Sequence, residues 1–246
     1  MDVGACSHRG RVRKRNEDYY YIPEGPKDIQ NLLIVADGMG GHNAGDIASF
    51  VAVNTAADVI GQIIRDSQNV LSNEEKIYKA FSEANMRIFD MAQQEEKYNG
   101  MGTTMTLALL CHDEVIIGHV GDSRAYLFRG DDLIQITQDH SLVEELVKNG
   151  SITADEALHH PQKHYITRSL GTGRHVEIDI FNIFLKPEDM LLLCSDGLVD
   201  CVSEEKIKEV LSTKAPCAQL AEQLIEIAIE QGGNDNVTAV LYCNSR

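Results

Sequence analysis

The stretch Leu32-Leu33-Ile34-Val35-Ala36-Asp37-Gly38-Met39-Gly40-Gly41-His42 joins an apolar run of strand length to an acidic residue and a glycine-rich turn. The apolar run predicts a buried strand. A carboxylate at the end of such a strand is costly to desolvate unless a positive group meets it. Asp37 therefore indicates a site where a cation is held.

The same arrangement recurs at three further places along the chain. Asp122 follows residues 115–121, Asp196 follows residues 190–195, and Asp235 stands just before residues 237–241. One aspartate beside a glycine is commonly only a turn residue, but turn chemistry does not explain the ordered set. Oxygen ligands on rigid strands suit Mg²⁺ or Mn²⁺. The set predicts a metal site assembled from distant segments.

Composition limits the possible partners and compartments. The chain has 246 residues and a formal net charge of −16, which argues against nucleic acid as a partner and means that an anionic substrate needs local positive charge. Its six cysteines form no C-x-x-C pair and are typical of free thiols in a reducing compartment. The longest apolar runs are only as long as a strand, so we expect no membrane span. The N-terminus carries no apolar core of a signal peptide, so we expect a cytoplasmic protein.

The periodicity predicts an α+β protein with an antiparallel β-core flanked by helices. Helical patterns cover residues 47–64, 73–92, 204–211 and 217–231, and Ser72 with Glu75 has the form of a capping box at the start of the second. A strand meander covers residues 103–136, with further strands near 177–184, 190–194 and 237–241. No linker or repeat divides the chain, so we expect a single domain over residues 1–246.

Residues 139–170 interrupt the meander with two short helix signals, each of which has the form of a capping box. These are Ser141 with Glu144, and Thr153 with Glu156. We interpret the segment as a helical flap over a site. Its His159, His160 and His164 lie in a polar insertion, and we expect them to be exposed and to have no carboxylate or thiol partner. His119 is expected in the core, and His140 is expected to cap a flap helix.

Two other segments bear on ligand chemistry. The glycine turn lacks the third glycine of a dinucleotide fingerprint, because position 43 is Asn, and no G-K-[ST] triplet exists for a P-loop. The run of residues 9–18 places several arginines directly before Glu17 and Asp18. A basic run is often only a solvated surface. A cationic fork beside carboxylates also suits a site that holds both phosphate and metal.

Six motifs in register resemble the bacterial PP2C-type (PPM) Ser/Thr protein phosphatases over nearly the whole chain. They are Arg9-Gly10-x-Val12-Arg13-x-x-Asn16-Glu17-Asp18, Val35-Ala36-Asp37-Gly38-Met39-Gly40-Gly41-His42, Gly102-Thr103-Thr104, Gly121-Asp122-Ser123-Arg124, Ser195-Asp196-Gly197 and Gly233-x-Asp235-Asn236. The resemblance implies a β-sandwich flanked by helix pairs on both sides, in α-β-β-α layers. One departure is Lys163-His164, where family members often carry Arg-Asn.

The resemblance also implies a role for each matching residue. Asp37 would bridge two Mn²⁺ or Mg²⁺ ions, the Gly38 carbonyl would bind one of them, and Asp196 and Asp235 would bind the other. Asp18 and Glu17 match an acidic pair at or just outside the metal shell, and Asp122 with Asp196 matches a third, weaker metal site. Arg13 matches the phosphate-binding arginine, and His42 matches the proposed general acid.

The implied reaction is hydrolysis of phosphoserine and phosphothreonine in proteins by a metal-activated water, without a covalent phosphoenzyme. The resemblance further implies that the protein opposes a Ser/Thr kinase, and we expect a monomer. Two alternatives stay open. The domain could be catalytically silent and only bind phosphoproteins or a regulator, or it could hydrolyse small phosphoesters at the same centre.

Overall fold

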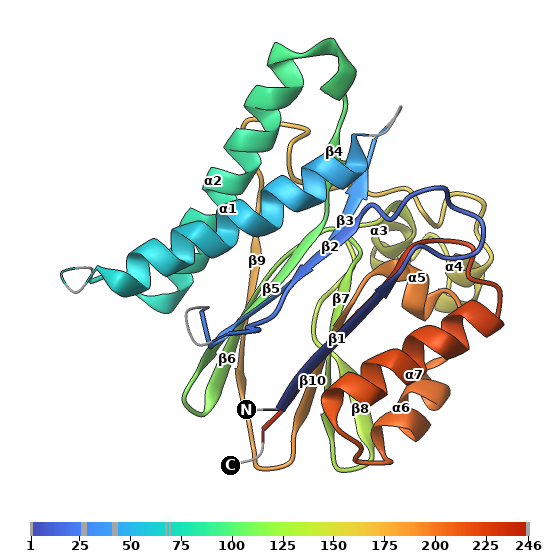
Figure 1. Cartoon of the computed structure of the whole chain (residues 1–246). Coiled ribbons are helices and arrows are strands. Elements are labelled where there is room, and N and C mark those ends of the chain that lie inside the picture. Colours follow the sequence, from blue (N-terminus) through green and yellow to red (C-terminus); the bar gives the residue numbers. More distant parts are fainter. Residues whose placement is uncertain (1, 26–28, 41–43, 67, 69, 245–246) are drawn as a thin grey trace.

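The computed structural model describes residues 2–25, 29–40, 44–66, 68 and 70–244 as two antiparallel β-sheets packed face to face (Figure 1). The first sheet has five strands. Their order is β1 (Asp2–His8), β11 (Val237–Cys243), β10 (Met190–Cys194), β7 (Arg124–Arg129) and β8 (Asp132–Gln135).

The second sheet contains the strand that opened the sequence analysis. Its order is β2 (Asp18–Tyr21), β3 (Leu32–Met39), β5 (Met105–Cys111), β6 (Glu114–Val120) and β9 (Asp179–Phe184), with β4 (Gly102–Thr103) paired to the end of β3. The predicted strand over residues 103–111 is thus divided at Thr104. The Thr104 N–H still donates to the carbonyl oxygen of Asp37, its register partner, but the Asp37 N–H donates to the Thr104 side chain at Oγ1.

The position of β3 between the other sheet and the helices explains why its sequence is continuously apolar. Leu33 and Val35 face the first sheet, where they meet Leu191 and Val240. Leu32 and Ile34 face the helices on the other side. Because both faces are covered, the strand shows no alternation of polar and apolar residues.

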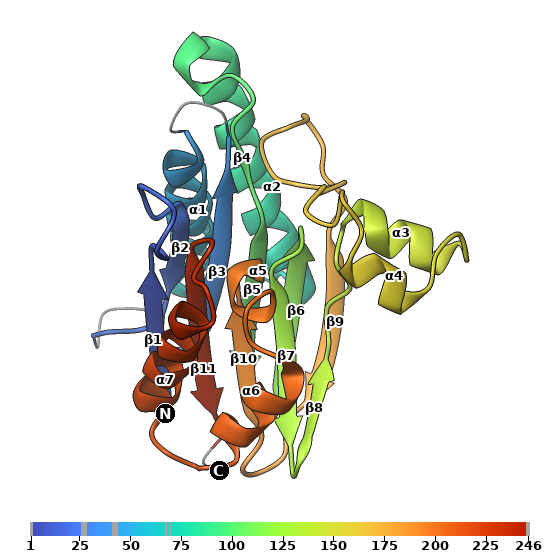
Figure 2. The same ribbon diagram turned by 90° about the vertical axis from the view of Figure 1, so that its right-hand side faces the viewer.

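Helices cover both outer faces, so the predicted α-β-β-α layers are confirmed (Figures 1 and 2). Helices α1 (Gly45–Arg65) and α2 (Asn73–Gln94) cover the second sheet. The first sheet is covered by α5 (Asp196–Val199), α6 (Glu204–Leu211) and α7 (Cys217–Glu230). The predicted capping box at Ser72 is confirmed.

Two helical features differ from the sequence predictions. Helix α5 was not predicted, because a single turn has little intrinsic stability and forms only where tertiary contacts support it. The longest apolar runs were expected to be of strand length, yet helix α1, with 21 residues and a mean hydropathy of 1.6, is long and apolar enough for a membrane span. Its apolar surface is explained by packing, since eleven of its residues are buried in the fold.

The flap carries α3 (Leu142–Lys148) and α4 (Ala154–Leu158), and a 3₁₀ turn, η1 (Glu96–Tyr98), follows α2. The capping box at Thr153 is confirmed, whereas Ser141 accepts the Glu144 N–H without the reciprocal bond. Figures 1 and 2 show α3 and α4 outside the sandwich, at the end where α5 begins.

Candidate metal centre

Residues from distant parts of the chain line one cavity of about 660 Å³. Its walls include most of the residues predicted from the sequence, namely Arg13, Glu17, Asp37, Gly38, Asp122, Asp196 and Asp235. Asp37 lies near the end of β3, Asp122 lies between β6 and β7, and Asp235 lies between α7 and β11. The strand ends therefore meet as predicted, because both sheets terminate at this end of the sandwich.

Asp18 lies deep beside this cavity rather than on its wall. It stands opposite Asp37 in the β2–β3 ladder and is only 6% exposed. Its Oδ2 accepts hydrogen bonds from Ser195 Oγ and Thr238 Oγ1, both at 2.7 Å. Thr238 is on β11 and Ser195 directly follows β10, so both hydroxyls approach from the side of the first sheet and fix the carboxylate in one orientation.

Three carboxylate oxygens at this centre lack a partner among the described residues. They are the buried Oδ1 atoms of Asp18, Asp122 and Asp196. A buried acceptor without a partner is costly, and a bound cation would satisfy it. The donor set is entirely oxygen, which fits Mn²⁺ or Mg²⁺. The residues present therefore fit a centre for divalent cations.

The pKa values of the buried acids also favour a cation at this centre. Burial raises the pKa of Asp37 well above its usual value, and the neighbouring Asp18, Asp196 and Asp122 raise it further. Burial raises the pKa of Asp18 to about 7 against the opposing hydrogen bonds from Thr238 and Ser195. The pKa values of Asp122 and Asp196 are also raised, mainly by burial. Without cations this group of acids favours bound protons, and a divalent cation would replace them.

Gly38 lets the backbone come close at the rim of the centre. A Cβ at this position would collide with the carbonyl oxygen of Gly45. The Gly38 N–H donates to the carbonyl oxygen of Glu17 at 3.1 Å, which fixes the β3 end against the acidic pair. Burial, with Asp46 nearby, raises the pKa of Glu17.

The β1–β2 loop supplies positive charge to the cavity. Arg13 Nη2 lies 2.6 Å from Asp235 Oδ2, and the Arg13 side chain is half exposed. Asn236 holds the loop by donating from Nδ2 to the carbonyl oxygens of Arg9 and Arg15, while its Oδ1 accepts the Glu17 N–H. Asn236 thereby sets where Arg13 stands relative to the acids.

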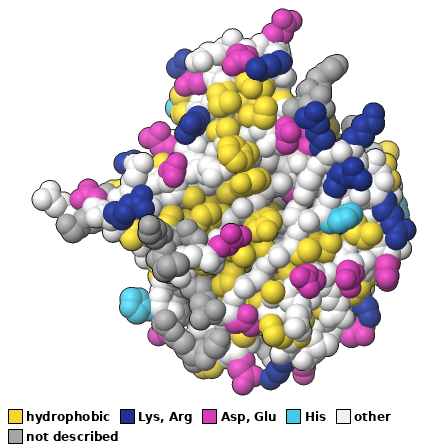
Figure 3. Space-filling model, viewed as in Figure 1, with side chains coloured by type: hydrophobic (Ala, Val, Ile, Leu, Met, Phe, Trp, Pro, Cys, Tyr) yellow, Lys and Arg dark blue, Asp and Glu magenta, His cyan; other side chains and the backbone are white. Residues whose placement is uncertain are grey.

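Figure 3 shows Lys and Arg side chains gathered over the part of the molecule where this loop lies. All five basic residues of the loop are exposed, namely Arg9, Arg11, Arg13, Lys14 and Arg15. This local positive surface offsets the net charge of −16 for an anionic ligand. Of the predicted site residues, His42 lies outside the described residues.

The flap contributes side chains that the sequence did not place at the site. Lys163 and His164 line the cavity. Lys163 Nζ lies 3.1 Å from Asp200 Oδ1, and His164 Nδ1 lies 3.5 Å from Asp200 Oδ2. His164 is exposed as predicted, but the expectation that it has no carboxylate neighbour is wrong. Asp200 is 36 residues away in the sequence, so only the tertiary fold reveals the pair.

The structure also places His119 and His140, the two histidines for which the sequence predicted structural roles. His119 is fully buried in β6, as expected, and its Nδ1 lies 2.9 Å from Thr106 Oγ1. His140 was expected to cap a flap helix, but the N-cap is Ser141. The His140 ring instead accepts the Gly121 N–H at Nδ1.

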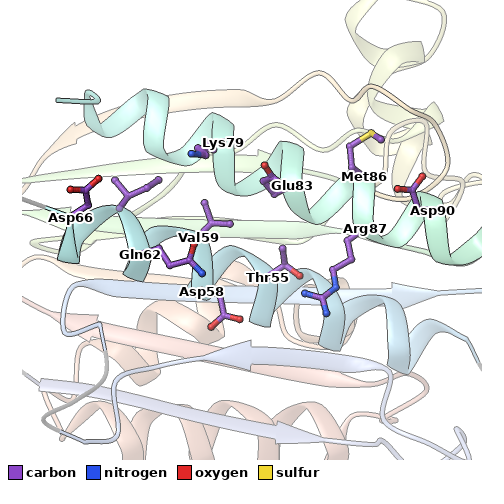
Figure 4. A pocket seen from close by; sticks show the side chains of 11 residues that line it. Thr55, Asp58, Val59, Gln62, Asp66, Lys79, Glu83, Met86, Arg87 and Asp90 are labelled. Atoms are coloured by element: carbon purple, nitrogen blue, oxygen red, sulfur yellow. The ribbon is translucent and has the colours of Figure 1, made fainter. Parts of the chain in front are cut away.

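A second groove lies on the outer surface between α1 and α2 (Figure 4). Its volume is about 680 Å³, and its walls carry acidic residues such as Asp58 and Glu83 together with Lys79 and Arg87. None of the acids of the metal centre lines this groove. Its mixed charges show no convergent set of ligands, so size alone does not make it the reactive site.

The chain is similar to known proteins over nearly its whole length. A family model described as protein phosphatase 2C matches residues 7–242. The serine/threonine phosphatase stp of Listeria innocua is 42% identical over 95% of this chain and 92% of its own length. Protein phosphatase PhpP of Streptococcus pneumoniae is 37% identical over 98% and 96%. The catalytic domain of serine threonine protein phosphatase PstP, solved in complex with 2 manganese ions, is 38% identical with a TM-score of 0.85 over 97% of this chain and 96% of that one.

Proposed function

Because this chain belongs to the protein phosphatase 2C family, it is a metal-dependent serine/threonine protein phosphatase, and we propose that the acidic cavity is where it performs that reaction. The observation that carries the proposal is the convergence of buried, unpartnered carboxylate oxygens beside an arginine in one cavity. Two Mn²⁺ or Mg²⁺ ions are its core cofactors.

We propose a specific set of residues for the ions. Asp37 would lie between the two core ions, the Gly38 carbonyl would bind one, and Asp196 with Asp235 would bind the other. Asp18, with Glu17 outside it, would hold the ions or their waters. Asp122 would join Asp196 at a third, weaker site, which its unpartnered Oδ1 supports.

The reaction would need both the bound cations and three side chains, Arg13, Asn236 and His42. Bound cations supply a water of lowered pKa and positive charge opposite the phosphoryl oxygens. Arg13 would grip two of those oxygens through its guanidinium and orient the phosphorus for in-line attack. Asn236 would keep Arg13 in place through its bonds to the loop. His42 is the proposed proton donor to the leaving seryl or threonyl oxygen.

Phosphorylated proteins are the substrates of this family, and we propose that a Ser/Thr kinase produces those of this chain. The exposed basic loop supports binding of an acidic phosphopeptide. We also propose a monomer in the cytoplasm; all six cysteines lie in the described part of the chain and are free thiols, which suits a reducing compartment.

Hydrolysis of a phosphothreonine peptide by chelator-stripped protein tests the proposal. We expect no phosphate release without metal and full release when Mn²⁺ is added back, because the centre needs cations to activate water. A free phosphomonoester assayed in parallel separates a protein phosphatase from a hydrolase of small phosphoesters. Tight Mn²⁺ binding without phosphate release would instead favour a silent phosphoprotein-binding domain.

Replacing Arg13 tests its role in binding phosphate. We expect Arg13→Ala to lower kcat/KM by about 10-fold to 100-fold, from the loss of about 1.5–3 kcal/mol of charge-assisted hydrogen bonding. Most of the change should be in KM, since the guanidinium grips the phosphate in the ground state as well. Steady-state kinetics on the phosphothreonine peptide measure this split.

Arg11→Ala is the matched control, because Arg11 is exposed on the same loop but does not line the cavity. It removes the same charge from the loop, so any general effect of charge appears in both variants. An unchanged KM in Arg13→Ala would assign the phosphate to another cation, and Lys163 in the cavity wall would be the next candidate.

A further inference from the structure

His140 stands where the flap leaves the sandwich, and it makes both backbone hydrogen bonds of Gly121. The Gly121 N–H donates to His140 Nδ1 at 2.9 Å, and the His140 N–H donates to the Gly121 carbonyl oxygen at 2.7 Å. Asp122 is the next residue in the chain. The position of that carboxylate is therefore tied to the His140 ring.

These bonds define the state of the ring. Because a backbone N–H can only donate, Nδ1 must offer a lone pair, and the ring proton of neutral His140 is on Nε2. Nε2 lies 3.2 Å from Asp179 Oδ2, which accepts that proton. The ring is thus fixed at both nitrogen atoms.

The same cluster holds the other end of the flap. The Thr167 N–H donates to the His140 carbonyl oxygen at 2.8 Å. Arg168 Nη1 donates to Asp179 Oδ1 at 2.8 Å, and the same carboxylate accepts the His140 Nε2–H. The two ends of the flap meet at one histidine, and that histidine also holds the turn that carries Asp122.

The surroundings leave this turn little freedom. His140 is 7% exposed, and its ring packs 4.9 Å from the ring of the fully buried His119. Gly121 has φ of +112°, and a Cβ there would collide with Thr104. Thr104 Oγ1 lies 2.7 Å from Ser123 Oγ on the far side of Asp122. The turn is held from both sides, and His140 supplies the bonds on the flap side.

We propose that His140 is a positioning residue that orients the Asp122 carboxylate toward the third cation. Through His140 the orientation of Asp122 is also coupled to the base of the flap. The inference rests on the proposed role of Asp122 as a ligand of that cation. The positioning depends on one acceptor atom, His140 Nδ1, which accepts the Gly121 N–H. Hydrogen-bond partners that lie behind metal ligands commonly change metal affinity by about 10-fold to 100-fold.

Two substitutions separate the ring nitrogens. In His140→Asn the amide oxygen can stand where Nδ1 stands and accept the Gly121 N–H. In His140→Gln the longer side chain places its amide near the Nε2 position, so the bond to Asp179 is kept and the acceptor for Gly121 is lost. Both variants remove the imidazole and its packing on His119, so they are matched for that loss.

Mn²⁺ titration by calorimetry is the first readout, with thermal melting of both metal-free variants as the check on folding. We expect His140→Gln to weaken the third Mn²⁺ site by about 10-fold or more and to leave the two core sites unchanged. His140→Asn should retain wild-type affinity at all three. The second readout needs no metal: the Gly121 amide resonance should shift, and its hydrogen exchange should quicken, in His140→Gln only.

Other results would overturn the inference in distinguishable ways. Equal third-site affinity in wild type and His140→Gln would show that the acceptor does not position Asp122. Equal weakening in Asn and Gln variants would assign the effect to ring packing. Only two bound ions in the wild type would overturn the assignment of Asp122 and this inference with it, while metal-dependent phosphate release in that same protein would leave the proposed function standing.

Discussion

Asp37→Asn should abolish metal-dependent phosphate release, with a loss of about 10³-fold or more in kcat. Asparagine keeps the side-chain volume and one acceptor oxygen, but it removes the negative charge proposed to lie between the two core ions. Asp37 stands among Asp18, Asp122 and Asp196, so the change reaches every ion at the centre. Release of phosphate from a phosphothreonine peptide at saturating Mn²⁺ measures the effect.

The matched control for this variant is Asp132→Asn. Asp132 is exposed at the start of β8 and does not line the cavity. It should retain wild-type turnover. Calorimetry on Asp37→Asn should also show fewer bound Mn²⁺ ions than in the wild type. Turnover near the wild-type level in Asp37→Asn would be incompatible with a centre in which Asp37 joins two ions.

Without cations, the folded protein should become less stable as the pH rises. Burial raises the folded-state pKa of Asp18 to about 7 and raises those of Asp37, Asp122 and Asp196. In the unfolded chain these carboxyls ionise near pH 4. The stability they give to the metal-free fold is therefore fully present below about pH 4 and is lost as the pH rises through the raised values.

We expect the chelator-stripped protein to lose about 3 kcal/mol of stability between pH 5 and pH 8, or roughly 6–12 °C in Tm. Saturating Mn²⁺ should remove this loss, because cations bind the ionised acids of the folded state only. Thermal melts across that range, with and without Mn²⁺, measure both effects.

Asp18→Asn provides the control for this experiment. An amide oxygen can still accept from Ser195 and Thr238, but the group no longer titrates. The pH dependence of the metal-free protein should therefore become weaker. A metal-free wild type that grows more stable from pH 5 to pH 8 would contradict the expectation, since it would mean that the buried acids are ionised without a cation.

The sequence predicted the features that depend on local patterns. The apolar run before Asp37 identified a strand and a charged group at its end, because such a carboxylate has no place in a core without a partner. The Ser72 capping box identified the start of α2 in the same way. The motifs predicted that Arg13 and Glu17 belong to the same site as Asp37, and all three line one cavity.

The meeting of the four aspartates was predicted, but several individual contacts between distant segments were not. The position of Asp18 opposite Asp37 depends on the β2–β3 register, and its hydroxyl partners approach from the side of the first sheet. The pair of His164 and Asp200 joins the flap to the residue that follows α5. His140 was misassigned because a helix N-terminus lay next to it in the sequence, whereas its ring contacts Gly121, 19 residues away.

The place of strand β11 has a consequence for the nascent chain. β11 pairs with β1 on one side and with β10 on the other, and Asp235 directly precedes it. Among the described strands, β1 is made first, and it has no neighbour in its sheet until β11 emerges. Because Asp235 directly precedes β11, the acidic cavity lacks part of its wall until then, so we expect the nascent chain to become active only after β11 has been made.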